Sequence, residues 1–136
     1  MSTPTQKTLA RLRRDGYLCA IVEKYNAHTK TRQDLYEFID VIGVGPLGTI
    51  AVQSTSKSNF SSRQAKVVGR KVPKDKKEED KILRIRSNVI ACLSAGWLIE
   101  IHGWEKGDTQ NPRVEVISLD ALSDVFNTED PDKRAV

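Results

Sequence analysis

The hydrophobic and polar positions along the chain follow two different spacings, and their alternation predicts a mixed α/β fold. Helices are predicted at 4–15, 59–68 and 84–95, each followed by a glycine that can end a helix. Shorter runs rich in β-branched and aromatic residues predict strands at 17–25, 35–44, 48–55, 97–104 and 113–119. The resulting order of helix, three strands, two helices and two strands is typical of an α/β sandwich around a mixed sheet.

The segments between these elements complete the predicted domain. The turn Gly45-Pro46-Leu47-Gly48 joins two of the strands as an antiparallel hairpin. Residues 70–81 are highly charged and contain a proline, so we expect a mobile loop there. A short helix is expected at 120–126 and a flexible tail at 127–136. We therefore expect one α/β domain over residues 1–126, with a central mixed sheet of about five strands flanked by helices.

Composition narrows the class of protein. The chain has 136 residues, of which 38% are hydrophobic and 29% charged, which suits one domain with a substantial core. No apolar run approaches the ~20 residues that span a membrane, and the basic N-terminus lacks the apolar segment of a secretion signal. We therefore expect a cytoplasmic protein without a membrane partner. Cys19 and Cys92 are expected to be buried free thiols, and with two histidines they make no zinc ligand set.

Charge is distributed unevenly along the chain. Residues 1–86 contain 18 Lys and Arg against 9 Asp and Glu, whereas residues 87–136 contain 4 against 9. A basic front half suits a protein that presents one face to a polyanion such as DNA. The alternative is that much of this charge belongs to a solvated loop at 70–81.

Polar residues on two of the predicted strands indicate a candidate metal site. Side chains alternate between the faces of a strand, so Asp40 shares its face with Phe38, and Gln53 shares its face with Thr55. If the hairpin register brings these faces together, a carboxylate, an amide oxygen and a hydroxyl converge, and Glu23 can add a second carboxylate. Such oxygen donors suit Mg²⁺ or Mn²⁺. The alternative is that these are ordinary polar residues on the wet face of an edge strand.

Several segments of the chain resemble a known nuclease family. An Asp on one hairpin strand followed by Gln53-x-Thr55 on the next is similar to the core of the PD-(D/E)XK nuclease superfamily. The ordered segments LRRDGYLCAIVEKYN, RQDLYEFIDVIGV, IAVQSTSKSN, SSRQAKV and WLIEIHGWEK, within roughly residues 9–106, resemble small phage-type Holliday-junction-resolvase-like nucleases. The resemblance implies a restriction-endonuclease-like fold. It also implies that Asp40 is the metal-binding aspartate and that Gln53 takes the place of the motif Glu or Gln.

Two departures from the family pattern affect the expected chemistry. Thr55 stands where the motif lysine should be, and Glu23 substitutes for a glutamate that related resolvases carry on the first helix. Some relatives supply the missing positive charge from the following helix, where Lys57, Arg63 and Lys66 are the candidates, Lys66 being favoured. A glutamine instead of a glutamate removes one negative charge, which predicts weak metal binding without DNA and stronger binding with it.

The resemblance implies a metal-dependent endonuclease that hydrolyses phosphodiester bonds in DNA and selects branched substrates. Asp40, Gln53, Thr55 and Lys66 would form the catalytic site, with Mg²⁺ or Mn²⁺ and no organic cofactor. Contacts to the DNA backbone are expected from the 70–77 stretch and from the following residues: Lys30, Arg32, Lys57, Arg63 and Lys66. A homodimer is expected by analogy with resolvases, as is a phage-encoded enzyme that acts in the host cytoplasm. Two alternatives are a non-catalytic nuclease-fold module that binds DNA or protein, and a subunit whose site is completed within a larger assembly.

Three further polar residues are interpreted from their sequence context. Asp34 precedes a strand and is interpreted as a loop cap, with an acid supporting the metal site as the alternative. His28 is interpreted as a surface histidine of a polar, basic loop expected at 26–34, with a phosphate contact as the alternative. His102 lies between Trp97 and Trp104, where Gly103-Trp104 is interpreted as a bend with a packing aromatic, and a catalytic role for His102 is the disfavoured alternative.

Overall fold

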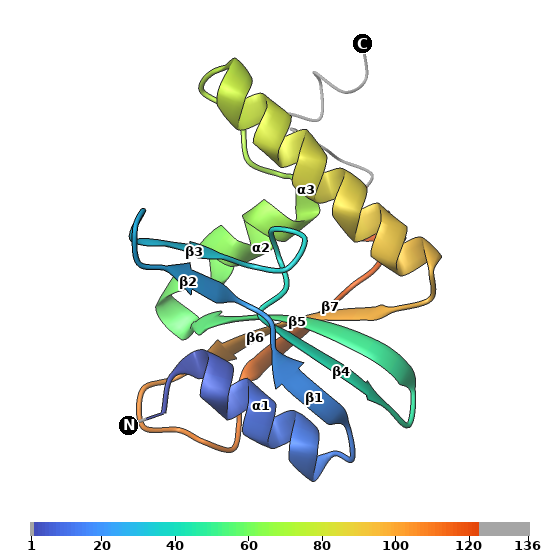
Figure 1. The fold of residues 1–136 in the computed structure, drawn as a ribbon. Helices are drawn as coiled ribbons and strands as arrows, with labels where there is room; N and C mark the ends of the chain where they lie inside the picture. The colour runs from blue at the N-terminus through green and yellow to red at the C-terminus, as the bar shows by residue number, and fades with distance from the viewer. Residues whose placement is uncertain (1, 123–136) are drawn as a thin grey trace.

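The chain folds around a five-stranded mixed sheet in the computed structural model, which describes residues 2–122 (Figure 1). The strand order is β1-β4-β5-β6-β7, in which β5 and β6 run parallel and all other neighbours run antiparallel. These strands are β1 (Leu18–Ile21), β4 (Val41–Gly45), β5 (Gly48–Ser56), β6 (Leu98–Trp104) and β7 (Arg113–Ile117). The predicted α/β domain with a mixed sheet of about five strands is confirmed.

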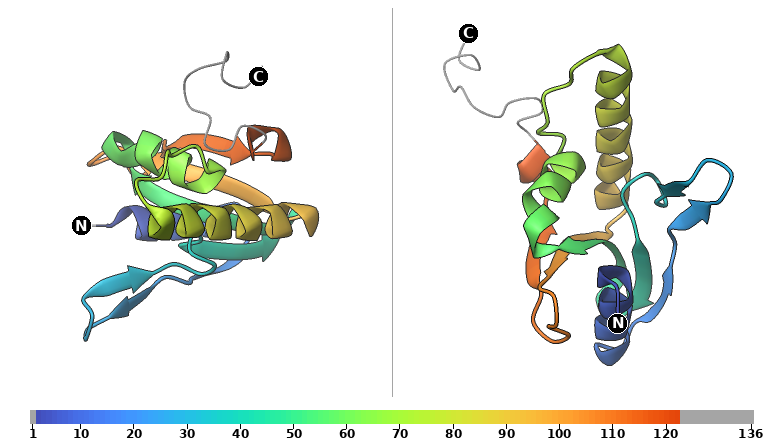
Figure 2. Two further views of the ribbon diagram at one scale, coloured as in Figure 1. Left: turned by 90° about the horizontal axis from the view of Figure 1, so that it is seen from above. Right: turned by 90° about the vertical axis from the view of Figure 1, so that its left-hand side faces the viewer.

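Three α-helices cover the two faces of this sheet. Helix α1 (Pro4–Arg14) packs on one face, and α2 (Phe60–Val68) and α3 (Lys76–Ser94) pack on the other (Figure 2). Thr3 caps α1 as its sequence predicts: its hydroxyl accepts from the Gln6 amide, and the Gln6 side chain accepts from the Thr3 amide. The described residues also form two short 3₁₀ helices, Lys57–Asn59 and Leu119–Leu122.

The core has two layers because β4, β5 and β6 are buried on both faces. Val41, Ile50 and Val52 pack against Leu12 of α1. On the opposite face, Ala51, Ile99 and Ile101 of the sheet pack with residues of α2 and α3, namely Phe60, Val67, Ile85 and Val89. Burial on both faces explains the apolar residues at the start of β4 and in the first half of β5. The second half of β5 is polar, and its residues Gln53, Ser54 and Thr55 are nevertheless buried.

Three predicted boundaries are wrong. The segment 70–81 is not a loop throughout, because α3 begins at Lys76, where the Asp75 carboxylate accepts from the Glu78 amide at 2.8 Å. The predicted strand 17–25 is interrupted after Ile21. The predicted strand 35–44 begins only at Val41, after a tight turn.

The interrupted segment forms a separate two-stranded sheet, which we call the arm (residues 24–33). Its strands are β2 (Lys24–Asn26) and β3 (Thr31–Gln33), and they pair only with each other. Both views in Figure 2 show the arm standing apart from the central sheet and the helices.

The described residues contain no helix that is long and apolar enough to cross a membrane. The expected tail at 127–136 and the end of the expected helix at 120–126 lie outside the described residues.

Candidate metal centre

A tight turn between β3 and β4 brings two aspartates together. Leu35 and Ile39 pair as an isolated antiparallel bridge, with two backbone hydrogen bonds of 3.0 Å. Asp34 and Asp40 are the residues just outside this bridge, so the chain places them opposite each other. The interpretation of Asp34 as a loop cap is therefore wrong, because its side chain belongs to the candidate site.

Asp40 is anchored to β5 by the register of the hairpin. Val41 pairs with Val52, so Asp40 lies beside Gln53, as the alternation of side chains predicted. The Gln53 amide nitrogen donates to Asp40 Oδ2 at 2.6 Å, and the Ser54 backbone N–H donates to the same oxygen at 2.8 Å. The prediction that these two side chains converge from neighbouring strands is confirmed.

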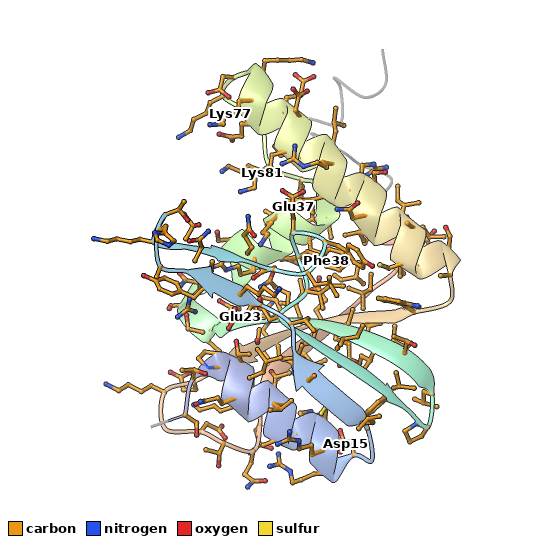
Figure 3. All side chains as sticks on the ribbon, viewed as in Figure 1. Asp15, Glu23, Glu37, Phe38, Lys77 and Lys81 are labelled. Carbon is orange, nitrogen blue, oxygen red and sulfur yellow. The ribbon has the colours of Figure 1, made fainter. Side chains whose placement is uncertain are left out.

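Three carboxylates meet at this point. Glu23, Asp34 and Asp40 each offer an oxygen, and these oxygens lie within 4.8 Å of one another. Glu23 lies where the chain passes from β1 into the arm (Figure 3). We call these three residues the acidic cluster. Carboxylate oxygens at this spacing fit one hard divalent cation such as Mg²⁺ or Mn²⁺, with Glu23 in the expected role of second carboxylate.

The environment of Asp40 disfavours its charged form. The side chain is 3% exposed. Burial raises the pKa of Asp40 from 3.8 to about 8, helped by the neighbouring Asp34 and Glu23 carboxyls, and the hydrogen bond from the Ser54 backbone opposes this only in part. A bound cation would reverse the balance, because it stabilises the carboxylate.

Lys66 supplies positive charge at the edge of the acidic cluster. It lies on α2, and its Nζ is 3.2 Å from Asp34 Oδ2 and 3.3 Å from Gln53 Oε1. Lys66 and Asp34 are mostly buried, so this ion pair is shielded from solvent. The favoured candidate for the missing motif lysine therefore reaches the site, and Gln53 connects it to Asp40. The catalytic role of Lys66 stays a prediction.

The acidic cluster lies in a cleft of about 430 Å³. Residues of α1, β5, α2, α3 and the arm contribute to its walls, including Thr5, Thr55, Arg32, Arg63, Lys66 and Lys81. Arg32, Asp34, Lys66 and Lys81 also line an adjoining cleft between the arm and α3. Lys81 extends from the α3 helix (Figure 3). We call these two adjoining spaces the site cleft; its floor is acidic and much of its rim is basic.

Two of the predicted DNA-binding lysines lie away from this cleft. Lys57 is 3.8 Å from Glu105 in an exposed ion pair, and Lys30 lies at the turn of the arm with a φ of 56°. Neither lines the site cleft. The expectation that Lys57 supplies the missing charge at the metal site is therefore not supported by its position.

The sequence interpretation missed Lys81 and Ser54. Lys81 was assigned to a loop, whereas it lies in α3, which begins at Lys76. Ser54 contributes a backbone donor, which any residue type at that position could supply. The signal available for Lys81 was the cap Asp75 with Glu78 three residues later.

The two histidines have no part in the acidic cluster. His102 is fully buried beneath α1, with Nδ1 3.2 Å from the Thr8 hydroxyl and Nε2 2.8 Å from Glu100. Trp104, which was interpreted as a packing aromatic, is buried as well. His28 is exposed at the turn of the arm, as expected for a surface histidine.

Comparison with known proteins returns no relative: no protein-family model, no curated protein and no solved structure matches the chain.

Proposed function

We propose that the chain is a metal-dependent endonuclease that hydrolyses phosphodiester bonds in DNA. One observation carries the proposal: three carboxylates and a partly buried lysine share the floor of a cleft whose rim is basic. A cation held by carboxylates beside a lysine is the chemistry that a phosphodiester bond requires, because both charges can stabilise the phosphate as it is attacked.

The acidic cluster would hold one Mg²⁺ or Mn²⁺ ion. Such an ion polarises a bound phosphate and lowers the pKa of a bound water. Glu23, Asp34 and Asp40 are its expected ligands. The Oε1 atom of Gln53 now accepts from Lys66, and it is the next oxygen available at the site. Asp34 adds a carboxylate where Gln53 lacks one, which offsets the charge that the glutamine removes.

The other residues of the site would orient and balance charge. Lys66 Nζ would face the phosphate and stabilise negative charge that develops on it. Gln53 holds Asp40 through its amide nitrogen and so fixes the direction of that carboxylate. Thr55 lies on the wall of the same cleft and would orient a water or a phosphate oxygen. These roles follow the resemblance to PD-(D/E)XK nucleases, with Lys66 in place of the motif lysine.

The basic rim of the site cleft would bind the DNA backbone. Arg32, Arg63 and Lys81 lie at its walls with exposed side chains. Contacts to phosphates position DNA without reading its sequence, so affinity should fall steeply with salt concentration. Selection of branched DNA, assembly as a homodimer and action in the cytoplasm remain part of this proposal through the resemblance to resolvases.

The test compares cutting by matched variants. Purified protein is incubated with branched, linear duplex and single-stranded DNA in Mn²⁺, and the products are separated on a denaturing gel. We expect cutting by the wild type, loss of cutting in Asp40→Asn, and full activity in Asp15→Asn. Asp15 is the control because it is an exposed acid at the far end of α1 (Figure 3). Cutting by Asp40→Asn, or cutting by the wild type after the metal is removed, would contradict the proposal.

One observation favours a non-catalytic DNA-binding module as the second candidate. Asp40 Oδ2 already accepts from two nitrogen donors of β5, so the protein satisfies this oxygen without a cation. A module would bind DNA in the same assay without cutting it, and Asp40→Asn would leave its affinity unchanged.

A further inference from the structure

The two strands of the arm are not stabilised by packing against the core of the protein. All six residues of β2 and β3 are exposed, and the arm contributes nothing to either layer of the core. A two-stranded hairpin exposed on both faces is marginally stable by itself. The arm therefore presents an extended surface that is free to contact a partner.

The charge of the arm indicates what kind of partner it fits. Residues 24–33 contain Lys24, Lys30 and Arg32 and no acidic residue. Arg32 also lines the site cleft beside Asp34. A negatively charged partner that contacts the arm thus continues into the cleft that holds the acidic cluster. Nucleic acid is the polyanion that fits both features.

The register of the arm places an aromatic ring next to Arg32. Tyr25 pairs with Arg32, and directly opposed residues of an antiparallel pair point to the same face. Of the arm residues, Arg32 alone lines the cleft of about 430 Å³ that holds the acidic cluster. Tyr25 therefore lies on the face of the arm from which Arg32 reaches that cleft. Tyr25 is 64% exposed, so its ring is available to a ligand.

We propose that Tyr25 stacks on an unpaired base of the DNA whose backbone Arg32 contacts. The inference rests on the proposed function and deepens it, because it names the feature of the substrate that the protein selects. In a paired duplex every base face is covered by its neighbours, whereas an unpaired base at a fork or branch offers a free face. An exposed aromatic ring beside an arginine is the pairing that binds such bases without regard to sequence. The arm therefore favours DNA with unpaired bases over fully paired DNA.

Binding is tested with two DNA molecules of equal length, a fork with unpaired arms and a fully paired duplex. All proteins carry Asp40→Asn so that no strand is cut, and the protein with this change alone is called the parent. Base stacking is worth ~1–3 kcal/mol, so Tyr25→Ala should weaken fork binding by about 5- to 150-fold. Duplex binding should change by less than about twofold, and Tyr25→Phe should bind both molecules like its parent, because the ring is retained. Arg32→Ala should weaken both molecules and lower the salt slope by about one unit.

Stacking has a direct readout as well. A 2-aminopurine in the unpaired arm of the fork should lose fluorescence on binding the parent and Tyr25→Phe proteins, and should keep it with Tyr25→Ala at saturating protein. Equal melting temperatures of the three proteins show that the body of the protein remains folded.

Each other outcome is decisive. Equal losses for fork and duplex in Tyr25→Ala, or no loss for either, overturn the role of Tyr25 while the nuclease proposal stands. Absence of DNA binding by the parent and the wild type overturns both proposals.

Discussion

The raised pKa of Asp40 predicts that Asp40→Asn stabilises the metal-free protein, and increasingly so as pH rises. In the folded protein burial raises the pKa of Asp40 to about 8, whereas its ordinary value is 3.8. Between these values the folded state holds a proton that the unfolded state has lost. The free energy of unfolding therefore falls as pH rises through this window, and the loss is complete above pH 8.

The magnitude follows from the size of the pKa shift. Each pH unit inside the window costs ~1.4 kcal/mol, so Asp40 should lower the free energy of unfolding by up to about 4 kcal/mol between pH 5 and pH 8. An asparagine keeps an oxygen for the Gln53 and Ser54 donors and presents an amide to the carboxylates of Asp34 and Glu23. It has no charge to lose or gain, so this contribution disappears.

Urea unfolding of both proteins in EDTA at pH 5 and pH 8 measures the effect. The difference in the free energy of unfolding, variant minus wild type, cancels the titration of other groups to first approximation. We expect this difference to grow toward pH 8 by up to about 4 kcal/mol. A difference that stays constant, or a variant that is less stable at pH 8, would refute the argument that burial and neighbouring acids strain Asp40.

Three further predictions concern the metal, the lysine and the packing of the sheet. Mn²⁺ should raise the melting temperature more at pH 8 than at pH 6, because it binds the deprotonated acidic cluster; an equal rise in Asp40→Asn would contradict this. Lys66→Met should slow single-turnover cutting by at least about 100-fold while calorimetry shows Mn²⁺ binding intact; unchanged cutting would show that Lys66 is not the missing motif charge. Gly103→Ala should destabilise the protein by about 1–3 kcal/mol, because its Cβ would lie 2.6 Å from the Phe60 ring. Adding Phe60→Leu should recover part of that loss, and strictly additive effects in thermal melts would argue against the contact.

The pairing of Asp40 with Gln53 was predictable because two local rules determine it. Alternation along each strand fixes which residues share a face, and the short turn from Gly45 to Gly48 fixes the register. Both rules use residues close in sequence, so the sequence sufficed. The signal in the sequence was the position of Asp40 and Gln53 on two neighbouring predicted strands.

Asp34 was not predictable in the same way. The turn that brings it to Asp40 uses left-handed backbone at Tyr36 and Glu37, with φ values of 53° and 68°. Tyrosine and glutamate do not predict a turn with left-handed backbone, because glycine and asparagine are the residues usually found there. The segment therefore reads as a continuous strand, and a continuous strand would carry Asp34 away from Asp40.

The start of α3 was missed for a different reason. The density of charge in 70–81 and the proline at position 73 favoured a loop, although Asp75 and Glu78 carried a capping signal. Within the first turns of the helix, Lys76 Nζ lies 3.3 Å from Asp80 Oδ1 in an i,i+4 ion pair, so these charges stabilise the helix. The arm also lay beyond sequence reasoning, because β2 and β3 are too short and too exposed to show a periodic pattern.

The most direct measurement is the position of Mn²⁺ in a crystal of the protein grown near pH 8, located by its anomalous scattering. The account predicts a peak about 2.0–2.5 Å from carboxylate oxygens of Asp40 and at least one of Asp34 and Glu23, and no such peak in Asp40→Asn. A strong peak elsewhere, with Asp40 still bound only by Gln53 and Ser54, would contradict the account.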